Sequence, residues 1–167
     1  KKCDNDNPIL DGNLPDGSRI NVIRAPFTMG SPAISIRKYL KFKASFEENP
    51  EIFGADKNLI DFLRAAIFAK SNLIVSGGTG VGKTTFLNLL INEIPKTERL
   101  VTIEDTFELQ INQPNLVRLE SGAKGGSSKA LLSTRDLVRN TLRMRPDRII
   151  IGEVRGGELF DLLQAMN

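Results

Sequence analysis

The sequence contains no histidine, no tryptophan and a single cysteine, Cys3. The missing histidines exclude from these residues a Ser–His–Asp triad, a histidine general base and a histidine-ligated metal. One cysteine can form neither a disulfide within the chain nor a cysteine-based zinc site. No run of about 18 apolar residues occurs, so the sequence predicts no helix that spans a bilayer.

The composition is that of a globular protein. The 167 residues are 40% hydrophobic and 26% charged, which excludes collagen-like, disordered and coiled-coil chains and allows one domain or slightly more. The net charge is only +3 and lysine and arginine form no cluster, so nucleic acid is not an expected partner. The first residues are polar, which argues against a signal peptide. Because the chain does not start with Met and ends in a helical pattern, we expect a piece cut at both ends.

Apolar periodicity predicts an α/β protein with a β-rich start. Isoleucine and valine at every second position predict strands over 19–23 and 33–38. Further on, we expect helices over 57–70, 86–94, 134–144 and 157–166, strands over 73–75, 100–103, 117–119 and 148–152, and a flexible loop over 121–129. Such alternation predicts βαβ units and a parallel sheet with helices on both faces.

A glycine-rich stretch matches the phosphate-binding pattern G-x-x-x-x-G-K-[ST]. It runs from Gly77 to Thr84, between a predicted strand and a predicted helix. Glycines let backbone amides surround phosphate oxygens, and the helix directs its positive end at the same anion. We expect Lys83 to contact the β- and γ-phosphates and Thr84 to bind Mg²⁺. The residues predicted to bind the nucleotide are Gly78, Thr79, Gly80, Val81, Gly82, Lys83, Thr84 and Thr85.

Acidic residues follow two of the predicted strands. The strand over 100–103 leads into Glu104 and Asp105, with Glu108 a turn later, and the strand over 148–152 leads into Glu153. In a doubly wound sheet these ends face the ligand, where carboxylates hold Mg²⁺ and orient water. Gly152 stands where many P-loop ATPases have an aspartate, so Glu153 would act on the metal through water, as a base, or both.

Several arginines lie in the last third of the sequence. Arg139, Arg143 and Arg145 lie on or just after one predicted helix, and Arg155 follows Glu153 by two positions. Arginine suits phosphate recognition and the stabilisation of transition-state charge. For Arg139 and Arg143 we favour pairing with nearby acids such as Asp136 and Asp147, whereas Arg155 is a candidate for the site.

An ordered set of motifs resembles the secretion ATPase superfamily of type II secretion, type IV secretion and type IV pilus machines. Within this resemblance, the tight-adherence pilus branch is nearest and the type IV secretion branch next. The set comprises residues 14–19, 35–38, the P-loop, 103–105, 142–148 and 152–155. The resemblance implies a RecA-like P-loop core preceded by part of a small α+β domain, with domains over 1–44 and 55–167 and a linker over 45–54. It also implies that the family's His box would come after Asn167.

The resemblance also implies roles for individual residues. Glu104 would orient water, Glu153 would be the Walker B glutamate, and Arg19 and Arg37 would approach the phosphates when a hexameric ring closes. We therefore expect an ATP-hydrolysing, Mg²⁺-dependent motor subunit for type IV (tight-adherence) pilus assembly or type II or type IV protein secretion. It would be cytoplasmic and peripheral at the inner membrane, acting on a membrane platform protein. Whether the isolated piece turns over ATP is open.

Three other functions are possible for a P-loop protein of this kind. A nucleic-acid translocase would show nucleic-acid-stimulated turnover, and a regulatory module would bind ATP without hydrolysing it. A small-molecule kinase would need an acceptor pocket and lid that the sequence does not reveal. The GTPase patterns D-x-x-G and N-K-x-D are absent, which favours ATP over GTP.

Overall fold

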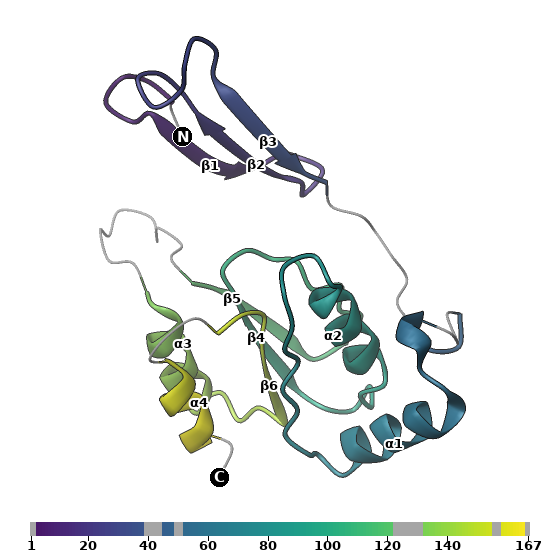
Figure 1. Ribbon diagram of the computed structural model, residues 1–167. Helices are drawn as coiled ribbons and strands as arrows, with labels where there is room; N and C mark the ends of the chain where they lie inside the picture. The colour runs from purple at the N-terminus through teal and green to yellow at the C-terminus, as the bar shows by residue number, and fades with distance from the viewer. Residues whose placement is uncertain (1–2, 39–44, 49–51, 122–131, 155–157, 166–167) are drawn as a thin grey trace. The chain divides into compact units, whose positions relative to one another are not determined.

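The computed structural model describes residues 3–38, 45–48, 52–121, 132–154 and 158–165. The chain forms two compact units, Lys1–Phe42 (unit 1) and Lys43–Asn167 (unit 2). Each unit contains a three-stranded sheet (Figure 1).

Unit 1 is an antiparallel sheet of strands β1 (Ile9–Asn13), β2 (Arg19–Ile23) and β3 (Ala33–Arg37), in that order. A tight turn joins β1 to β2: the amide of Gly17 donates to the carbonyl of Leu14 at 2.9 Å, and Gly17 takes a positive φ of 88°. Both predicted strands are present. Strand β1 was not predicted because its apolar residues do not alternate.

The sheet of unit 1 has one apolar and one polar face, because side chains alternate along each strand. Leu10, Val22 and Ile34 are in register across the three strands, and so are Gly12, Ile20 and Ile36. Arg19 and Arg37 are paired directly across β2 and β3 on the other face.

Unit 2 alternates helices and strands. Its elements are η1 (a 3-10 helix, Ile52–Gly54), α1 (Lys57–Phe68), α2 (Lys83–Asn92), β4 (Leu100–Glu104), β5 (Leu116–Glu120), α3 (Thr134–Thr141), β6 (Arg148–Ile151) and α4 (Glu158–Ala165). The strands are parallel in the order β5-β4-β6, so their carboxyl ends lie at one edge. The predicted parallel sheet is therefore confirmed.

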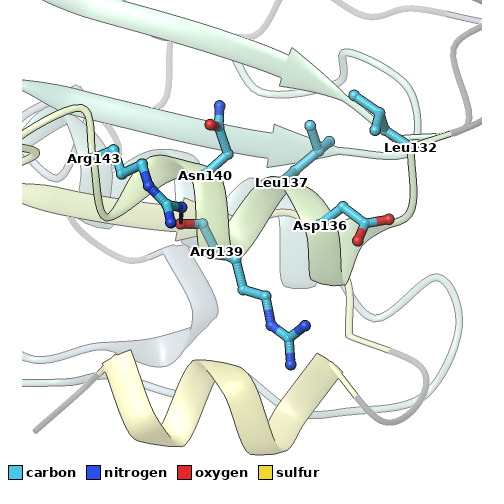
Figure 2. A pocket seen from close by; sticks show the side chains of 6 residues that line it. All are labelled: Leu132, Asp136, Leu137, Arg139, Asn140 and Arg143. Carbon is cyan, nitrogen blue, oxygen red and sulfur yellow. Dashed lines mark hydrogen bonds between the residues drawn. The ribbon is translucent and has the colours of Figure 1, made fainter.

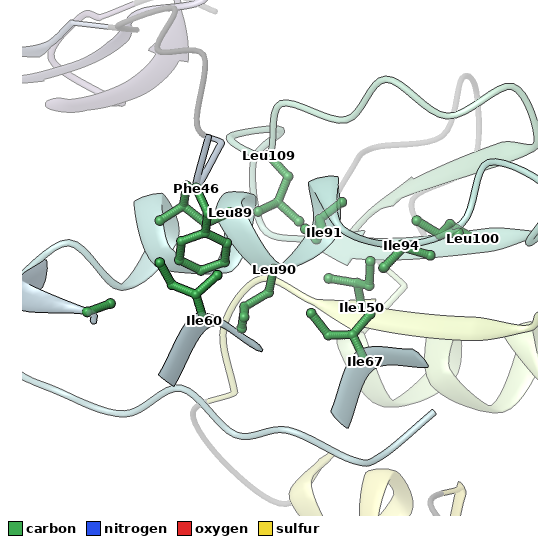
Figure 3. Packing of buried hydrophobic residues seen from close by; sticks show 11 residues of the cluster. Phe46, Ile60, Ile67, Leu89, Leu90, Ile91, Ile94, Leu100, Leu109 and Ile150 are labelled. Carbon is green, nitrogen blue, oxygen red and sulfur yellow. The ribbon is translucent and has the colours of Figure 1, made fainter. Parts of the chain in front are cut away.

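Two hydrophobic clusters cover opposite faces of this sheet. Residues of α1 and α2 pack with Leu100 and Ile150 in the larger cluster, which Figure 3 shows. Leu137 and Val138 of α3 pack with Ile103 in the smaller cluster, against Ile149 and Ile151. Because neighbouring residues of β6 belong to different clusters, both faces of the sheet are buried, as its continuous apolar sequence requires.

One predicted strand is not formed. Residues 73–75 have no strand conformation, and Ile74 is 73% exposed although a buried strand was expected there. In the described part of the sheet, the ladders join β4 to β5 and β4 to β6, and residues 73–75 take part in neither. An apolar run alone does not distinguish a strand from a packed loop, and here Val75 packs against the larger cluster.

Within the segment predicted as a linker over 45–54, Phe46 is packed into unit 2, whereas Glu47, Glu48, Phe53 and Gly54 are exposed. Phe46 is 2% exposed and belongs to the larger cluster of unit 2. In the sequence, the boundary between the two units falls between Phe42 and Lys43, a few residues before this segment. Its role as a linker between domains stays a prediction. Among the described residues, no helix is long and apolar enough to cross a membrane.

Candidate nucleotide-binding and hydrolysis site

The P-loop leads directly into α2. Gly82 is the N-terminal cap of this helix and takes a left-handed conformation with φ of 92°, and Gly80 has φ of 78°. Residues other than glycine rarely adopt such angles. No side chain caps the helix, so its first amides, which include those of Lys83, Thr84 and Thr85, are directed at the loop. This is the arrangement that binds phosphate at a helix N-terminus.

The ammonium group of Lys83 lies inside the loop. Its Nζ donates to the carbonyl oxygens of Gly77 at 2.9 Å and Gly78 at 2.5 Å. A Cβ on Gly77 would lie 2.9 Å from a methyl group of Val81, so the loop can close in this way only with glycine there. The lysine is thus held where it can meet a phosphate that the loop surrounds.

An aromatic ring covers the start of α2. A Cβ on Gly82 would lie 2.7 Å from the Phe53 ring, which also packs edge-to-face on Phe86 with centroids 5.5 Å apart. Phe53 has a positive φ of 60° and remains 49% exposed. Two features therefore favour glycine at position 82: its positive φ angle and the adjacent Phe53 ring.

The carboxyl ends of β4 and β6 are in contact. The amide of Gly152 donates to the carbonyl of Ile103 at 2.9 Å, and a Cβ on Gly152 would lie 3.3 Å from Cγ of Glu104. Glu104 closes β4 and Glu153 follows Gly152, so the two glutamates predicted for hydrolysis come from neighbouring strand ends. The Glu104 side chain occupies the space beside position 152, which explains why a glycine stands there.

Glu104 and Glu153 have different environments. Glu153 is exposed, whereas Glu104 is only 3% exposed. The Glu104 carboxylate accepts hydrogen bonds from the amides of Glu108 at 2.7 Å and Leu109 at 2.8 Å, from Arg118 Nη2 at 2.8 Å and from the Thr102 hydroxyl at 3.3 Å. A carboxylate offers about four lone-pair sites. Glu104 could therefore orient water only by giving up one of these bonds.

The other acids of this region lie closer to solvent. Asp105 is exposed and accepts a hydrogen bond from the Ser121 hydroxyl at 2.5 Å, and Glu108 is half-buried. Among the described residues, no group of three potential metal-binding side chains comes together.

Sequence reasoning missed the contacts that join the acids to the P-loop helix. Asn88 of α2 accepts a hydrogen bond from the amide of Gln110 at 2.9 Å, and Arg118 of β5 pairs with Glu104. Asparagine on a helix and arginine on a strand match no local pattern. The one available signal is a polar residue within the otherwise apolar sequence that follows the P-loop.

The predicted arginines are distributed over both units. Arg19 and Arg37 lie in unit 1, and Arg155 is outside the described residues. Arg139 does pair with an acid, but with Asp161 of α4 at 3.0 Å rather than with Asp136. Asp147 instead pairs with Lys70 at 3.2 Å and accepts from the amide of Arg99.

A hollow of about 360 Å³ lies beside α3, away from the predicted nucleotide residues. Figure 2 shows its lining side chains, Leu132, Asp136, Leu137, Arg139, Asn140 and Arg143. The guanidinium of Arg143 donates to the carbonyl of Arg139 at 3.3 Å. Both arginines thus make contacts within unit 2.

Comparison with known proteins identifies the family. The profile described as "Type II/IV secretion system protein" matches residues 1–167. The chain is 41% identical over 96% of its length to an uncharacterised protein of Methanocaldococcus jannaschii, of which it covers 23%. It is 37% identical over 98% of its length to the type IV secretion system protein PtlH of Bordetella pertussis, of which it covers 56%.

A solved structure supports the same assignment. The VirB11 ATPase of the Brucella suis type IV secretion system, in complex with sulphate, superposes with a TM-score of 0.55 at 30% identity, over 98% of this chain and 54% of that one. The chain thus spans about half or less of these relatives. Its mixed α/β architecture with a parallel sheet is that of a RecA-like ATPase core, and the chain belongs to the type II/IV secretion system protein family.

Proposed function

We propose that the protein is an ATP-hydrolysing motor subunit for type IV secretion or type IV pilus assembly. The observation that carries this proposal is the glycine loop before α2, with Lys83 held inside it and two acid-bearing strand ends in contact nearby. The similarity to PtlH and to a VirB11 ATPase supports the same machinery. The tight-adherence pilus branch stays a prediction.

In this proposal the P-loop binds the triphosphate of ATP. Backbone amides from Gly78 to Thr85 surround the phosphates, and the Lys83 ammonium exchanges its carbonyl partners for phosphate oxygens. Thr84 and Glu153 would hold Mg²⁺. The oxygen donors of a threonine, a carboxylate, water and phosphates suit this cation, which neutralises phosphate charge when bound.

The acids and arginines would act on the terminal phosphate. Glu153 is exposed directly after β6, where its carboxylate can accept a hydrogen bond from the attacking water. Arg19 and Arg37 of unit 1, and Arg155 next to Glu153, would stabilise the charge that develops on the transferred group. Glu104, at the end of β4, would orient the attacking water by giving up one of its present hydrogen bonds.

The proposal extends to the whole protein. We infer a homohexamer that works in the cytoplasm at the inner membrane on a platform protein of a secretion or pilus machine. Two other functions of a P-loop chain make different predictions. A nucleic-acid translocase would show turnover stimulated by DNA or RNA and weakened by salt. A regulatory module would bind ATP without turnover.

Replacing Lys83 by alanine tests the nucleotide site. Losing a charged hydrogen bond of about 2 kcal/mol should weaken ATP binding about 30-fold in calorimetric titration, with an unchanged circular dichroism spectrum. Lys57→Ala is the matched control, because Lys57 also occupies the first turn of a helix, α1, but adjoins no glycine loop. Equal ATP affinity in Lys83→Ala and wild-type protein would refute the site.

A further inference from the structure

The Phe53 ring lies on the start of the helix that follows the glycine loop. A Cβ on Gly82 would lie 2.7 Å from Cε1 and 2.9 Å from Cζ of this ring, so the ring contacts the backbone at the N-terminal cap of α2. The Phe86 ring, one helical turn later, packs against Phe53 at an interplanar angle of 84°. These two contacts fix the Phe53 ring beside the residues proposed to bind the phosphates of ATP.

Two features of Phe53 are unfavourable for the protein alone. Its φ of 60° and ψ of 17° are left-handed, a conformation that a bulky side chain rarely adopts. The residue is also 49% exposed, although an aromatic ring gains free energy when it leaves water. Backbone strain and exposed aromatic surface at one position beside a proposed binding site indicate a function beyond packing.

The ring and the acids lie on different sides of α2. The segment after β4, which carries Asp105, is bonded to Asn88, whose Oδ1 accepts from the amide of Gln110 at 2.9 Å. Phe53 instead packs on Phe86, two positions before Asn88, and two positions are about 200° around a helix of 3.6 residues per turn. A nucleotide bound across the helix start with its terminal phosphate toward the acids would direct its base away from them, toward the Phe53 side.

Phe107 is a less suitable ring for binding a base. It is 40% exposed, but the Arg118 guanidinium lies 4.6 Å from its centroid and so already covers one face of this ring. Phe107 also belongs to the segment after β4, on the side of the acids. Phe53 is therefore the better candidate.

We propose that Phe53 is the base-stacking residue of the nucleotide site, whose exposed surface receives the adenine ring of ATP. This inference rests on the proposed function, which assigns the phosphates to the glycine loop and leaves the base without a partner. A phenyl ring recognises a base by its π face and not by hydrogen bonds. Phe53 would therefore favour purines, which have the larger ring system, over pyrimidines, and would not itself distinguish adenine from guanine.

The test compares a ligand that has a base with one that has none. ADP and inorganic pyrophosphate both carry two phosphates, and their binding to the complete protein can be measured by calorimetric titration with Mg²⁺, without turnover. Phe53→Leu keeps an apolar side chain against Gly82 but removes the π face. It should weaken ADP binding at least about fivefold and leave pyrophosphate binding within about twofold. An equal loss for both ligands would overturn the inference, because the ring would then act through the shape of the loop.

Phe160→Leu is the matched control. Phe160 is also an exposed phenylalanine of unit 2, at 76%, but it belongs to α4, which is joined to α3 by the ion pair between Asp161 and Arg139. Helix α3 packs on the face of the sheet opposite α2. This variant should bind ADP and pyrophosphate as the wild type does. A loss of ADP binding equal to that in Phe53→Leu would overturn the inference.

A second measurement starts from the unaltered protein. The wild type should bind ADP at least about threefold more tightly than CDP, because the smaller base stacks over less area, and Phe53→Leu should bind the two nearly equally. Equal binding of ADP and CDP by the wild type, or an unchanged preference in Phe53→Leu, would overturn the inference and leave the proposed function standing. If the wild type bound neither ADP nor pyrophosphate, the proposed nucleotide site itself would be refuted, and the inference with it.

Discussion

The side chain of Glu104 lies close to the backbone of Gly152. The family resemblance left open why a glycine stands where many P-loop ATPases have an aspartate. The structure gives a steric reason, since a Cβ at this position would lie 3.3 Å from Cγ and 3.7 Å from Cα of Glu104. An aspartate would compete with the buried glutamate for the same space.

Gly152→Ala should therefore disturb Glu104 rather than the nucleotide. The added methyl group must displace Glu104 by a few tenths of an ångström, and overpacking of this kind costs about 1–2 kcal/mol. We expect this loss in urea unfolding, with ATP affinity unchanged and kcat reduced. Gly12→Ala is the control, because its Cβ would meet side chains only at 3.8 Å or more. Equal stability of Gly152→Ala and wild type would show that Glu104 can be displaced without a cost in free energy.

The conformation of the glycine loop proposed to bind phosphate could be predicted from the sequence, but the contacts that hold the segment after β4 could not. The P-loop is a contiguous motif whose glycines, Gly80 and Gly82 among them, take the positive φ angles that the pattern requires. The bond from Gln110 to Asn88 spans 22 positions in sequence. Such contacts depend on how helices and strands pack, and the types of residues involved do not reveal them.

At the level of secondary-structure elements, periodicity gave the type of each helix and less reliably its ends. Helix α2 begins at Lys83 rather than at 86, because the P-loop itself provides the first turn, with the Phe86 amide donating to the carbonyl of Gly82. Helix α3 ends at Thr141 rather than at 144. Residues 73–75 were predicted as a strand from composition, but a strand also needs a neighbour to pair with.

Arg148, at the start of β6, forms an ion pair with Glu98 and a hydrogen bond with the end of α1. Arg148 bonds Glu98 with its Nε, at 2.5 Å, and donates from Nη2 to the carbonyl of Ile67 at 2.6 Å. The Arg148 and Glu98 side chains are 13% and 12% exposed. The hydrogen bond from Arg148, opposed by burial, lowers the pKa of Glu98 below its ordinary value of 4.5. Arg148 also gives the Ile67 carbonyl a second hydrogen bond, since this carbonyl already accepts from the amide of Lys70 at 3.0 Å.

This pair predicts a specific loss of stability in acid. Because the pKa of Glu98 is lower in the folded state, its contribution is present above pH 4.5 and is lost as the pH falls through the folded value. Glu98→Gln should lower the free energy of unfolding by about 2 kcal/mol at pH 7 and by much less near pH 3. Urea unfolding at both pH values measures this difference. If the free energies of unfolding of wild type and variant differed equally at both pH values, the Glu98 charge would contribute nothing to stability.

At the scale of the whole molecule, the proposed function draws on both units. Unit 2 contains the P-loop and the acids, and unit 1 would contribute Arg19 and Arg37, which are paired directly across β2 and β3. In the proposed function, a phosphate would interact with both guanidinium groups.

Replacing either arginine should therefore lower the rate of ATP turnover and leave ATP binding nearly unchanged. In the complete protein we expect Arg19→Ala and Arg37→Ala to lower kcat at least about tenfold, because charge on the transferred phosphoryl group loses a partner. ATP affinity should stay within a few-fold, since the P-loop supplies most contacts. Lys38→Ala, one residue after β3, is the control. Wild-type turnover in both arginine variants would remove unit 1 from the reaction.

The Phe53 ring that rests on Gly82 has a practical consequence. The chain contains no tryptophan and one tyrosine, so Phe53→Trp would introduce the sole indole of the protein. That indole would lie against the helix terminus proposed to receive the phosphates, half in contact with water and half against Phe86. Its fluorescence would report changes at the phosphate-binding loop in real time, without an attached dye.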